Sequence, residues 1–204
     1  MKRLLKKKRQ NRRSPPARLR IVAGKWRGCF LPVVDEPGLR PTSERIRETL
    51  FNWLTAHLEG ANCLDLFAGT GALGFEALSR GAAKVCFIEG APKVAQAIRE
   101  AATVLQASDV NMQVVDAIAW LQTAKPQPFD IVFLDPPFAD DYYAELCRLL
   151  SERQWLAKIA YIYIERDSKE ALPVLPDGWN CIKEKKAGNV RYSLIRVMNK
   201  GRSR

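Results

Sequence analysis

The sequence predicts an α/β fold in which most strands of a seven-stranded sheet run parallel. From residue 61 onward, short apolar segments of strand length alternate with segments whose apolar residues recur at helical spacing. Such alternation gives parallel strands joined by right-handed helical crossovers. The last two strand-like segments are joined through Ala187-Gly188-Asn189 and predict an antiparallel hairpin at the C-terminal end of the sheet.

A small β-hairpin is expected before the sheet. Residues 19–23 and 29–34 have the character of strands, and they flank the turn Gly24-Lys25-Trp26-Arg27-Gly28. Because the tip combines cations with an aromatic ring, Lys25, Trp26 and Arg27 are candidates for contact with RNA, as is Arg40. The alternative is a surface hairpin whose charge is incidental.

The first helix is expected to begin near Thr42 or Ser43, since either side chain can cap a helix N-terminus. Apolar residues recur at helical spacing within residues 46–54 and predict a stripe that faces the core. Arg45 and Arg47 are expected elsewhere on the surface of this helix.

The remaining elements follow in alternation. Gly81 is expected to end the second helix, and Pro92 to open the third. The strands are expected at residues 63–67, 85–88, 112–115, 131–134, 161–164, 180–183 and 191–197. The later helices are expected at residues 72–80, 92–105, 117–123 and 142–150.

Positive charge is concentrated at the start of the chain. The net charge is +11, but residues 1–20 hold ten Lys or Arg and no acid, so the remainder carries 23 bases against 22 acids. The sequence therefore predicts a disordered basic tail over residues 1–18, suited to a polyanion or simply solvated. The hairpin extension then covers residues 19–40, and the main domain covers residues 41–199.

The composition disfavours metal, membrane and secretion. Five cysteines are scattered without C-x-x-C spacing, and the chain has a single histidine, His57. No metal is expected, and the cysteines are interpreted as reduced core residues of a cytoplasmic protein. No segment has the length of a membrane span, and the tail lacks the apolar core of a signal peptide. An organelle transit peptide stays open, because the tail is Arg-rich and free of acids.

A glycine loop follows the first predicted strand of the main domain. Gly69, Gly71 and Gly74 form the pattern G-x-G-x-x-G, and Glu89 lies twenty residues after Gly69. Glycines let backbone N–H groups approach a ligand at a helix N-terminus, and an acid after the second strand accepts hydrogen bonds from a ribose diol. Any adenosine-bearing cofactor fits this arrangement, including a nicotinamide dinucleotide.

Further acids at strand ends favour a different cofactor. Asp65, beside the glycine loop, would repel a pyrophosphate and attract a cationic amino-acid group. Asp116 follows the third strand, where it can accept from an adenine amine, and Asp135 follows the fourth. Any one of these acids alone would fit a helix cap. Four acids at one edge of a parallel sheet predict a ligand site.

Asp135-Pro136-Pro137-Phe138 predicts a clamp for a flat ring that bears an amine. Because proline lacks an N–H group, the backbone here offers carbonyl acceptors with few competing donors. An exocyclic amine would donate to the Asp135 carboxylate and the Pro136 carbonyl while Phe138 stacks on the ring. Two prolines that merely end a strand are the alternative.

These motifs together resemble a known family. The segment DLFAGTG at 65–71 and the motif DPPF at 135–138 resemble the class I S-adenosylmethionine-dependent methyltransferases that methylate exocyclic amines. The segments GLRPT at 38–42 and RIRETLFNWL at 45–54 resemble, more narrowly, the bacterial 16S ribosomal RNA guanine-N2 methyltransferase family. The resemblance implies a Rossmann-like class I methyltransferase fold, with S-adenosylmethionine as cofactor and ribosomal RNA as partner. A monomer acting on naked RNA or on an assembled small-subunit particle is expected.

The resemblance also implies roles for residues. The guanine amine would be held and oriented by Asp135, Pro136, Pro137 and Phe138. The cofactor would be held by Thr42, Arg45, Asp65, Phe67, Ala68, Gly69, Gly71, Glu89, Asp116 and Ala117. The base must leave its stack to enter such a site. Whether Asp135 takes a proton or only orients the amine stays open.

Three other functions share some of these sequence features. DNA amino-methyltransferases also use a D-P-P-aromatic motif, but they usually carry a separate target-recognition domain for which 204 residues leave little room. A non-catalytic RNA-binding protein would have no need of Asp135 and an intact glycine loop. A nicotinamide-dependent oxidoreductase is supported only by the glycine pattern.

Overall fold

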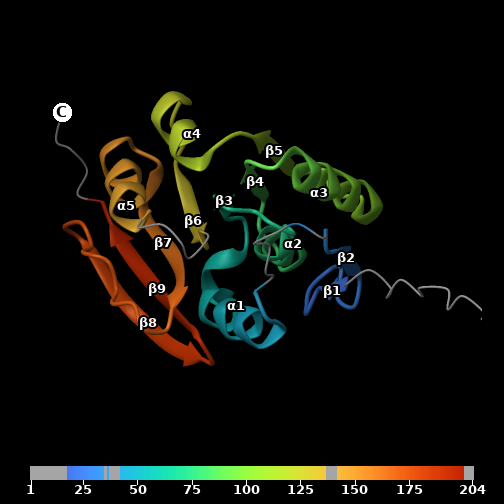
Figure 1. Cartoon of the computed structure of the whole chain (residues 1–204), viewed down its shortest axis with the longest axis horizontal. Coiled ribbons are helices and arrows are strands. Elements are labelled where there is room, and N and C mark those ends of the chain that lie inside the picture. Colours follow the sequence, from blue (N-terminus) through green and yellow to red (C-terminus); the bar gives the residue numbers. More distant parts are fainter. Residues whose placement is uncertain (1–17, 35, 37–41, 137–141, 200–204) are drawn as a thin grey trace, which may run out of the picture.

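The computed structural model describes residues 18–34, 36, 42–136 and 142–199 of the chain. Seven strands form one sheet in the order β5-β4-β3-β6-β7-β9-β8 (Figure 1). The strands are β3 (Asn62–Asp65), β4 (Lys84–Glu89), β5 (Val110–Val114), β6 (Phe129–Leu134), β7 (Leu156–Asp167), β8 (Trp179–Ala187) and β9 (Val190–Met198). The first five run parallel to one another, and β9 is antiparallel to both β7 and β8. The predicted α/β fold with a C-terminal antiparallel hairpin is confirmed.

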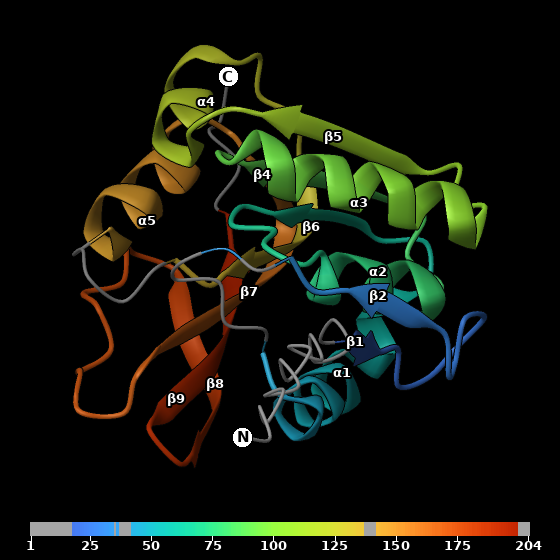
Figure 2. The same cartoon turned by 45° about the vertical axis from the view of Figure 1, so that its right-hand side comes forward.

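Helices cover both faces of this sheet (Figures 1 and 2). They are α1 (Glu44–Leu58), α2 (Ala72–Ser79), α3 (Pro92–Leu105), α4 (Ala117–Thr123) and α5 (Tyr143–Glu152). Alternate residues of a strand point to opposite faces. Ile131 and Phe133 of β6 accordingly join the cluster beneath α1, α2 and α3, whereas Val132 joins the cluster beneath α4 and α5.

The predicted helix starts agree with the structure to within two residues, whereas β7 and β8 are longer than the predicted strands. Ser43 caps α1 by accepting from the backbone N–H of Ile46, as expected. By contrast, β7 is twelve residues long, because β6 and β9 pair with it and supply backbone partners beyond its apolar centre. Strand β8 extends through Lys183 to Ala187 although its middle is exposed, because its ladder with β9 holds it at the sheet edge.

The predicted N-terminal hairpin is present and lies against α2 (Figures 1 and 2). Strand β1 (Arg18–Arg20) pairs antiparallel with β2 (Phe30–Pro32). Arg18 thus belongs to the hairpin, whereas it was expected in the tail; residues 1–17 of that tail lie outside the described part of the chain.

Trp26 corrects the prediction of an exposed aromatic tip. Its side chain is 9% exposed and belongs to the core cluster shared by α1, α2 and α3. The N–H of Trp26 donates to Ser79 Oγ at 2.9 Å, and the N–H of Lys25 donates to the Ser79 carbonyl at 2.6 Å. The turn is therefore docked on the end of α2, which buries the ring that the sequence suggested for RNA.

Within the described residues, no helix combines the length and apolar character needed to cross a membrane.

Candidate active site at the carboxyl edge of the sheet

The carboxyl ends of the parallel strands open into a cavity of about 1150 Å³. Loops after β3, β4, β5 and β6 line it, as do the start of α1 and the β8–β9 turn. Of the predicted site residues, those at its wall are Thr42, Asp65, Phe67, Ala68, Gly69, Glu89, Asp116, Ala117, Asp135 and Pro136. The structure thus gathers residues from across ninety positions of sequence into one site, as the strand-end pattern predicted.

The glycine loop is shaped by backbone geometry and by close packing. Gly71 is the N-cap of α2 and has a φ of 73°, in the left-handed region that favours glycine. A Cβ atom at Gly74 would lie 2.2 Å from the ring of Phe87, so glycine lets α2 pack closely on β4. Gly71 itself does not line the cavity, although its neighbours Thr70 and Ala72 do.

Asp65 is a buried carboxylate at the end of β3. It is 2% exposed, and its Oδ2 accepts from the Gly74 N–H at 3.1 Å. Burial raises the pKa of Asp65 to about 7; the charge of Glu89 acts in the same direction, and the hydrogen bond from Gly74 opposes it. Much of the energetic cost of ionising Asp65 is therefore left for a bound ligand to offset.

Asp135 lies at the end of β6, in the floor of the same cavity. Thr42 Oγ1 donates to Asp135 Oδ2 at 3.1 Å, which joins the start of α1 to this carboxylate. Asp135 is half-buried and lines the cavity. This burial raises the pKa of Asp135 well above its usual range; the charges of Glu165 and Asp65 add to the rise, and the Thr42 hydrogen bond opposes it. Pro136 is buried at the cavity wall, while Pro137 and Phe138 lie outside the described residues.

Glu89 and Asp116 line the cavity while bonding to nearby backbone groups. Glu89 accepts from the N–H groups of Gly69 and Ala91, each at 2.9 Å. Asp116 caps α4 by accepting from the Ala119 N–H at 2.8 Å. A carboxylate has about four acceptor positions, so these bonds fix both side chains and still allow ligand contacts. Their ribose and adenine roles stay predictions.

Arg45 is not brought to the cavity. It is exposed on the first turn of α1, and at this end of the helix the cavity wall is formed by Ser43 and Ile46. The helical rotation of about 100° per residue separates Arg45 from Ile46, the next residue, which lines the cavity. Its predicted contact with the cofactor therefore has no support in this arrangement.

Glu165 is the site residue that sequence reasoning missed. It is 5% exposed, lies near the end of β7 and lines the cavity beside Asp135. The signal was present, because Glu165 directly follows the predicted strand at 161–164, in the way that the other acids follow theirs. The β8–β9 turn, from Ala187 to Val190, also lines the cavity. Its sequence predicted a turn but gave no indication of a binding site.

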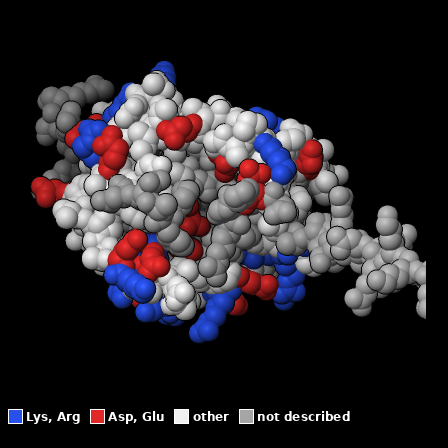
Figure 3. Space-filling view, viewed as in Figure 1, with Lys and Arg blue, Asp and Glu red and all other residues white. Residues whose placement is uncertain are grey.

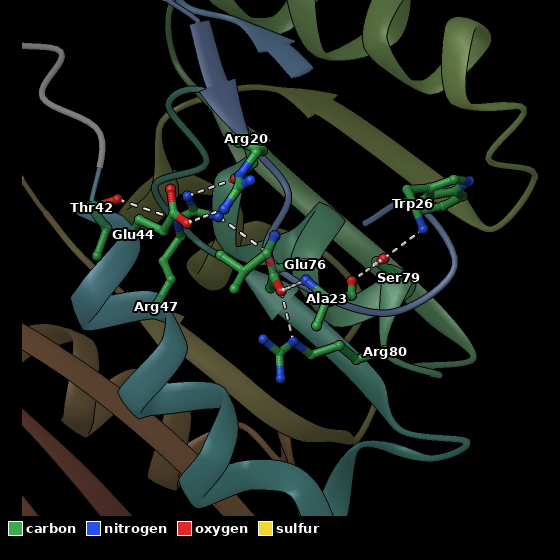
Figure 4. Close-up of polar contacts among 10 residues, drawn as sticks. Arg20, Ala23, Trp26, Thr42, Glu44, Arg47, Glu76, Ser79 and Arg80 are labelled. Atoms are coloured by element: carbon green, nitrogen blue, oxygen red, sulfur yellow. Dashed lines mark hydrogen bonds and ion pairs between the residues drawn. The ribbon is translucent and has the colours of Figure 1, made fainter. Parts of the chain in front are cut away.

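A second group of buried charges lies behind the site and corrects the placement of Arg47. Instead of lying on the helix surface, Arg47 is 1% exposed and its Nη1 pairs with Glu76 Oε2 at 3.1 Å (Figure 4). Arg80 Nε pairs with Glu76 Oε1 at 2.7 Å, and the N–H groups of Val22 and Ala23 donate to the same carboxylate at 2.8 and 3.0 Å. Glu76 thus links α1, α2 and the N-terminal extension.

Arg47 also connects this ion group to the cavity. Its Nη2 donates to the Arg20 carbonyl at 2.8 Å, and its Nε donates to the Thr42 carbonyl at 3.3 Å (Figure 4). Since the Thr42 hydroxyl bonds to Asp135, a continuous set of polar contacts runs from the N-terminal hairpin to the cavity floor.

The described surface gives the RNA candidates a mixed setting. Lys25 and Arg27 are exposed, and Lys25 Nζ lies 5.4 Å from the centre of the Trp26 ring. Arg40 lies outside the described residues. On the face in Figure 3, Lys and Arg lie among Asp and Glu, in keeping with the near-neutral balance of the chain after residue 20. Contact of Lys25 and Arg27 with RNA stays a prediction.

Known proteins resemble this chain over most of its length. The family described as Conserved hypothetical protein 95 matches residues 19–196. Ribosomal RNA small subunit methyltransferase D of Escherichia coli strain K12 is 44% identical over 190 residues, covering 93% of this chain and 96% of the relative. The protein of the same name from Haemophilus influenzae is 44% identical over 179 residues, covering 86% and 92%. The solved structure of yhhF from Escherichia coli has a TM-score of 0.82 and 43% identity, covering 90% of this chain and all of that chain.

Proposed function

This chain belongs to the Conserved hypothetical protein 95 family, and we propose that it methylates ribosomal RNA of the small subunit, at the exocyclic N2 amine of a guanine. Its fold is that of the class I methyltransferases. The substrate follows from relatives named ribosomal RNA small subunit methyltransferase D that are 44% identical to it. The guanine amine is the finer part of the proposal, and it rests on the Asp135-Pro136 site and on the resemblance of the sequence motifs.

The residues at the cavity fit S-adenosylmethionine, whose sulfonium, when bound, supplies the methyl group. The main support for this cofactor is that Asp65 and Asp135 line the same cavity and that both carboxyl groups have raised pKa values. Buried acids whose ionisation is unfavourable are suited to a cationic ligand. Asp65 with the backbone of Phe67–Gly69 would hold the amino-acid part, Glu89 the ribose, and Asp116 with Ala117 the adenine.

Asp135 and Pro136 would then hold the substrate amine. The Asp135 carboxylate and the Pro136 carbonyl accept its two N–H groups and turn the nitrogen lone pair toward the incoming methyl group. Positive charge that develops on the amine is stabilised by the neighbouring carboxylate, and the nitrogen then releases one N–H proton, to Asp135 or to water, to give the neutral methylated base. Thr42 fixes the Asp135 side chain through its hydroxyl, so the acceptor is in place before the base arrives.

The test is transfer of labelled methyl groups from S-adenosylmethionine to small-subunit RNA, free and in assembled particles. The modified RNA is digested and the methylated nucleoside is identified by mass spectrometry, with 2-methylguanosine as the expected product. Label in duplex DNA but not in RNA would establish a DNA methyltransferase instead. RNA binding without any transfer would leave a non-catalytic protein that keeps the fold.

A further inference from the structure

We propose that Glu165 is a specificity-determining residue that, beside Asp135, accepts the ring N1–H of guanine. This inference deepens the proposed function and rests on it. Asp135 and Glu165 would form a pair of acceptors for the two adjacent donors on one edge of the base, the N1–H and the N2 amine.

The sheet register places the two carboxylates side by side. Strands β6 and β7 are parallel, with Phe133 opposite Tyr163 and Leu134 opposite Ile164. Asp135 directly follows the last residue of β6 and Glu165 is the next residue of β7, so continuation of this register would set the two acids opposite each other. Phe133 and Tyr163 both join the cluster beneath α1, and side chains two residues apart share a face, so the two acids also lie on that face. Neighbouring strands are about 4.8 Å apart, and both acids line the cavity.

Hydroxyl groups fix Glu165 at this position. The Tyr163 hydroxyl donates to Glu165 Oε2 at 2.5 Å, and the Tyr143 hydroxyl donates to the Glu165 backbone carbonyl. The next residue, Arg166, donates to Ser193 Oγ at 2.8 Å. Successive side chains of a strand point to opposite faces, so this contact agrees with Glu165 pointing toward the cavity and Arg166 pointing away from it. A carboxylate has about four acceptor positions, and the Tyr163 hydroxyl uses one of them to orient Glu165.

Two adjacent acceptors discriminate between the amine-bearing bases. In guanine the N2 amine adjoins the N1–H donor. In adenine and cytosine the amine adjoins a ring nitrogen that is an acceptor, and a carboxylate facing that atom would meet a lone pair in place of a donor and be repelled. A site built to accept a ring N–H therefore rejects a base that lacks it.

The decisive experiment compares guanine with 2-aminopurine at the modified position of the RNA. Both bases carry the N2 amine, but 2-aminopurine has an acceptor at N1. The wild-type protein is expected to prefer guanine by at least about 100-fold in kcat/KM. Glu165→Gln replaces a charged acceptor by a neutral amide that can either accept from N1–H or donate to N1, so kcat/KM should fall by about tenfold for guanine and stay unchanged or rise for 2-aminopurine. The preference then falls to about tenfold or less.

Two further variants keep the result interpretable. Tyr163→Phe removes the hydroxyl that orients Glu165 and should reduce the preference for guanine by about tenfold. Asp167→Asn is the matched control, since Asp167 lies on the same strand, accepts from the Lys169 N–H and does not line the cavity. It should leave the preference unchanged. Affinity for S-adenosylmethionine, measured by calorimetry, should be similar in all four proteins.

Equal losses on both bases in Glu165→Gln would overturn the inference and assign Glu165 a structural part or a part in positioning Asp135. A wild-type protein that treats the two bases alike would also overturn it. If the wild-type protein transfers no methyl group even to the guanine RNA, the proposed function fails and the inference fails with it. The first two results leave the proposed function intact, so the two failures are distinct.

Discussion

Carboxylates are buried in two regions of the protein, and the charges that surround them differ between the two. Glu76, behind the site, is fully buried, and its two oxygens accept from two guanidinium groups and two backbone N–H groups. At the cavity, Asp65 accepts from the Gly74 N–H and Asp135 accepts from the Thr42 hydroxyl, and each lies near other acids.

The difference separates an acid that stabilises the fold from acids that we propose bind a ligand. Opposite charges and full hydrogen bonding compensate the burial of Glu76, so its negative charge is part of the packed structure. At the cavity, burial and like charges raise the pKa values of Asp65 and Asp135. Burial alone therefore does not mark a candidate site acid in this chain; Asp65 and Asp135 differ from Glu76 in forming no ion pair with Lys or Arg within the described residues.

The largest effect is expected from Asp135→Ala. Loss of the acceptor should reduce methyl transfer by about 1000-fold or more, because the amine is no longer oriented and its developing charge is no longer stabilised. Affinity for S-adenosylmethionine and the urea midpoint at pH 7 should not fall, since the variant removes a poorly compensated acid. Single-turnover transfer, calorimetry and urea unfolding measure the three quantities.

Asp135→Asn distinguishes an orienting part for Asp135 from a part as proton acceptor. Asn keeps an acceptor oxygen but cannot take a proton, so residual transfer well above that of Asp135→Ala would assign Asp135 an orienting part. Unchanged turnover in Asp135→Ala would remove Asp135 from the mechanism.

Glu76→Gln should give the largest loss of stability, about 3–5 kcal/mol, because Arg47 is left buried without its counter-charge. Urea unfolding measures this free energy. The added change Arg47→Met should recover part of the loss by removing the uncompensated cation. Arg20→Ala breaks an exposed pair with Glu44 and serves as the control, for which no measurable change is expected. Equal stability of Glu76→Gln and wild type would contradict the comparison of the two regions.

Asp65→Asn should change how stability depends on pH. The pKa of Asp65 is about 7 in the cofactor-free fold and near 3.8 for an ordinary Asp, so between pH 4 and 7 the folded state binds a proton that the unfolded state has lost. The contribution of Asp65 to the free energy of unfolding therefore decreases as pH rises through this window. Asp65→Asn should not show this decrease. Urea midpoints at several pH values measure it; parallel profiles for the two proteins would contradict the raised pKa.

The smallest effect is expected from Thr42→Val. The Thr42 hydroxyl bond lowers the pKa of Asp135, so its removal raises that pKa further. If turnover uses the ionised carboxylate, the rising limb of kcat/KM against pH moves to higher pH by roughly half a unit to one unit. Thr42→Ser keeps a hydroxyl and should retain the wild-type profile. Superimposed profiles for Thr42→Val and wild type would show that this bond does not tune Asp135.

Much of the fold and site could be predicted because local patterns carry them. Apolar runs, helical spacing and Ser43 at an N-cap are read within a few residues of sequence, and parallel strands must end at a common edge. Asp65, Glu89, Asp116 and Asp135 could therefore be assigned to one cavity without knowledge of any contact. Glu165 followed the same rule and was overlooked.

Other residues were misplaced because their surroundings come from distant sequence. Arg47 is hydrophilic and was expected on the helix surface, but Glu76 and the backbone of residues 20–23 meet it inside. Trp26 was expected at the tip of the hairpin. The end of α2, which covers it, lies more than fifty positions later in the sequence, so the residues around Trp26 give no sign of this contact.

By itself, then, the sequence determined the strand–helix alternation, the glycine loop, the row of acids and the Asp135-Pro136 motif. The tertiary structure alone decided that Glu76 pairs with Arg47 and Arg80, and that Asp65 and Asp135 line the cavity with no such pair among the described residues. It also set Glu165 directly beside Asp135. The physical reason is that the charge state and the accessibility of a buried group depend on everything packed around it, and in this chain those neighbours come from segments up to ninety-three residues away.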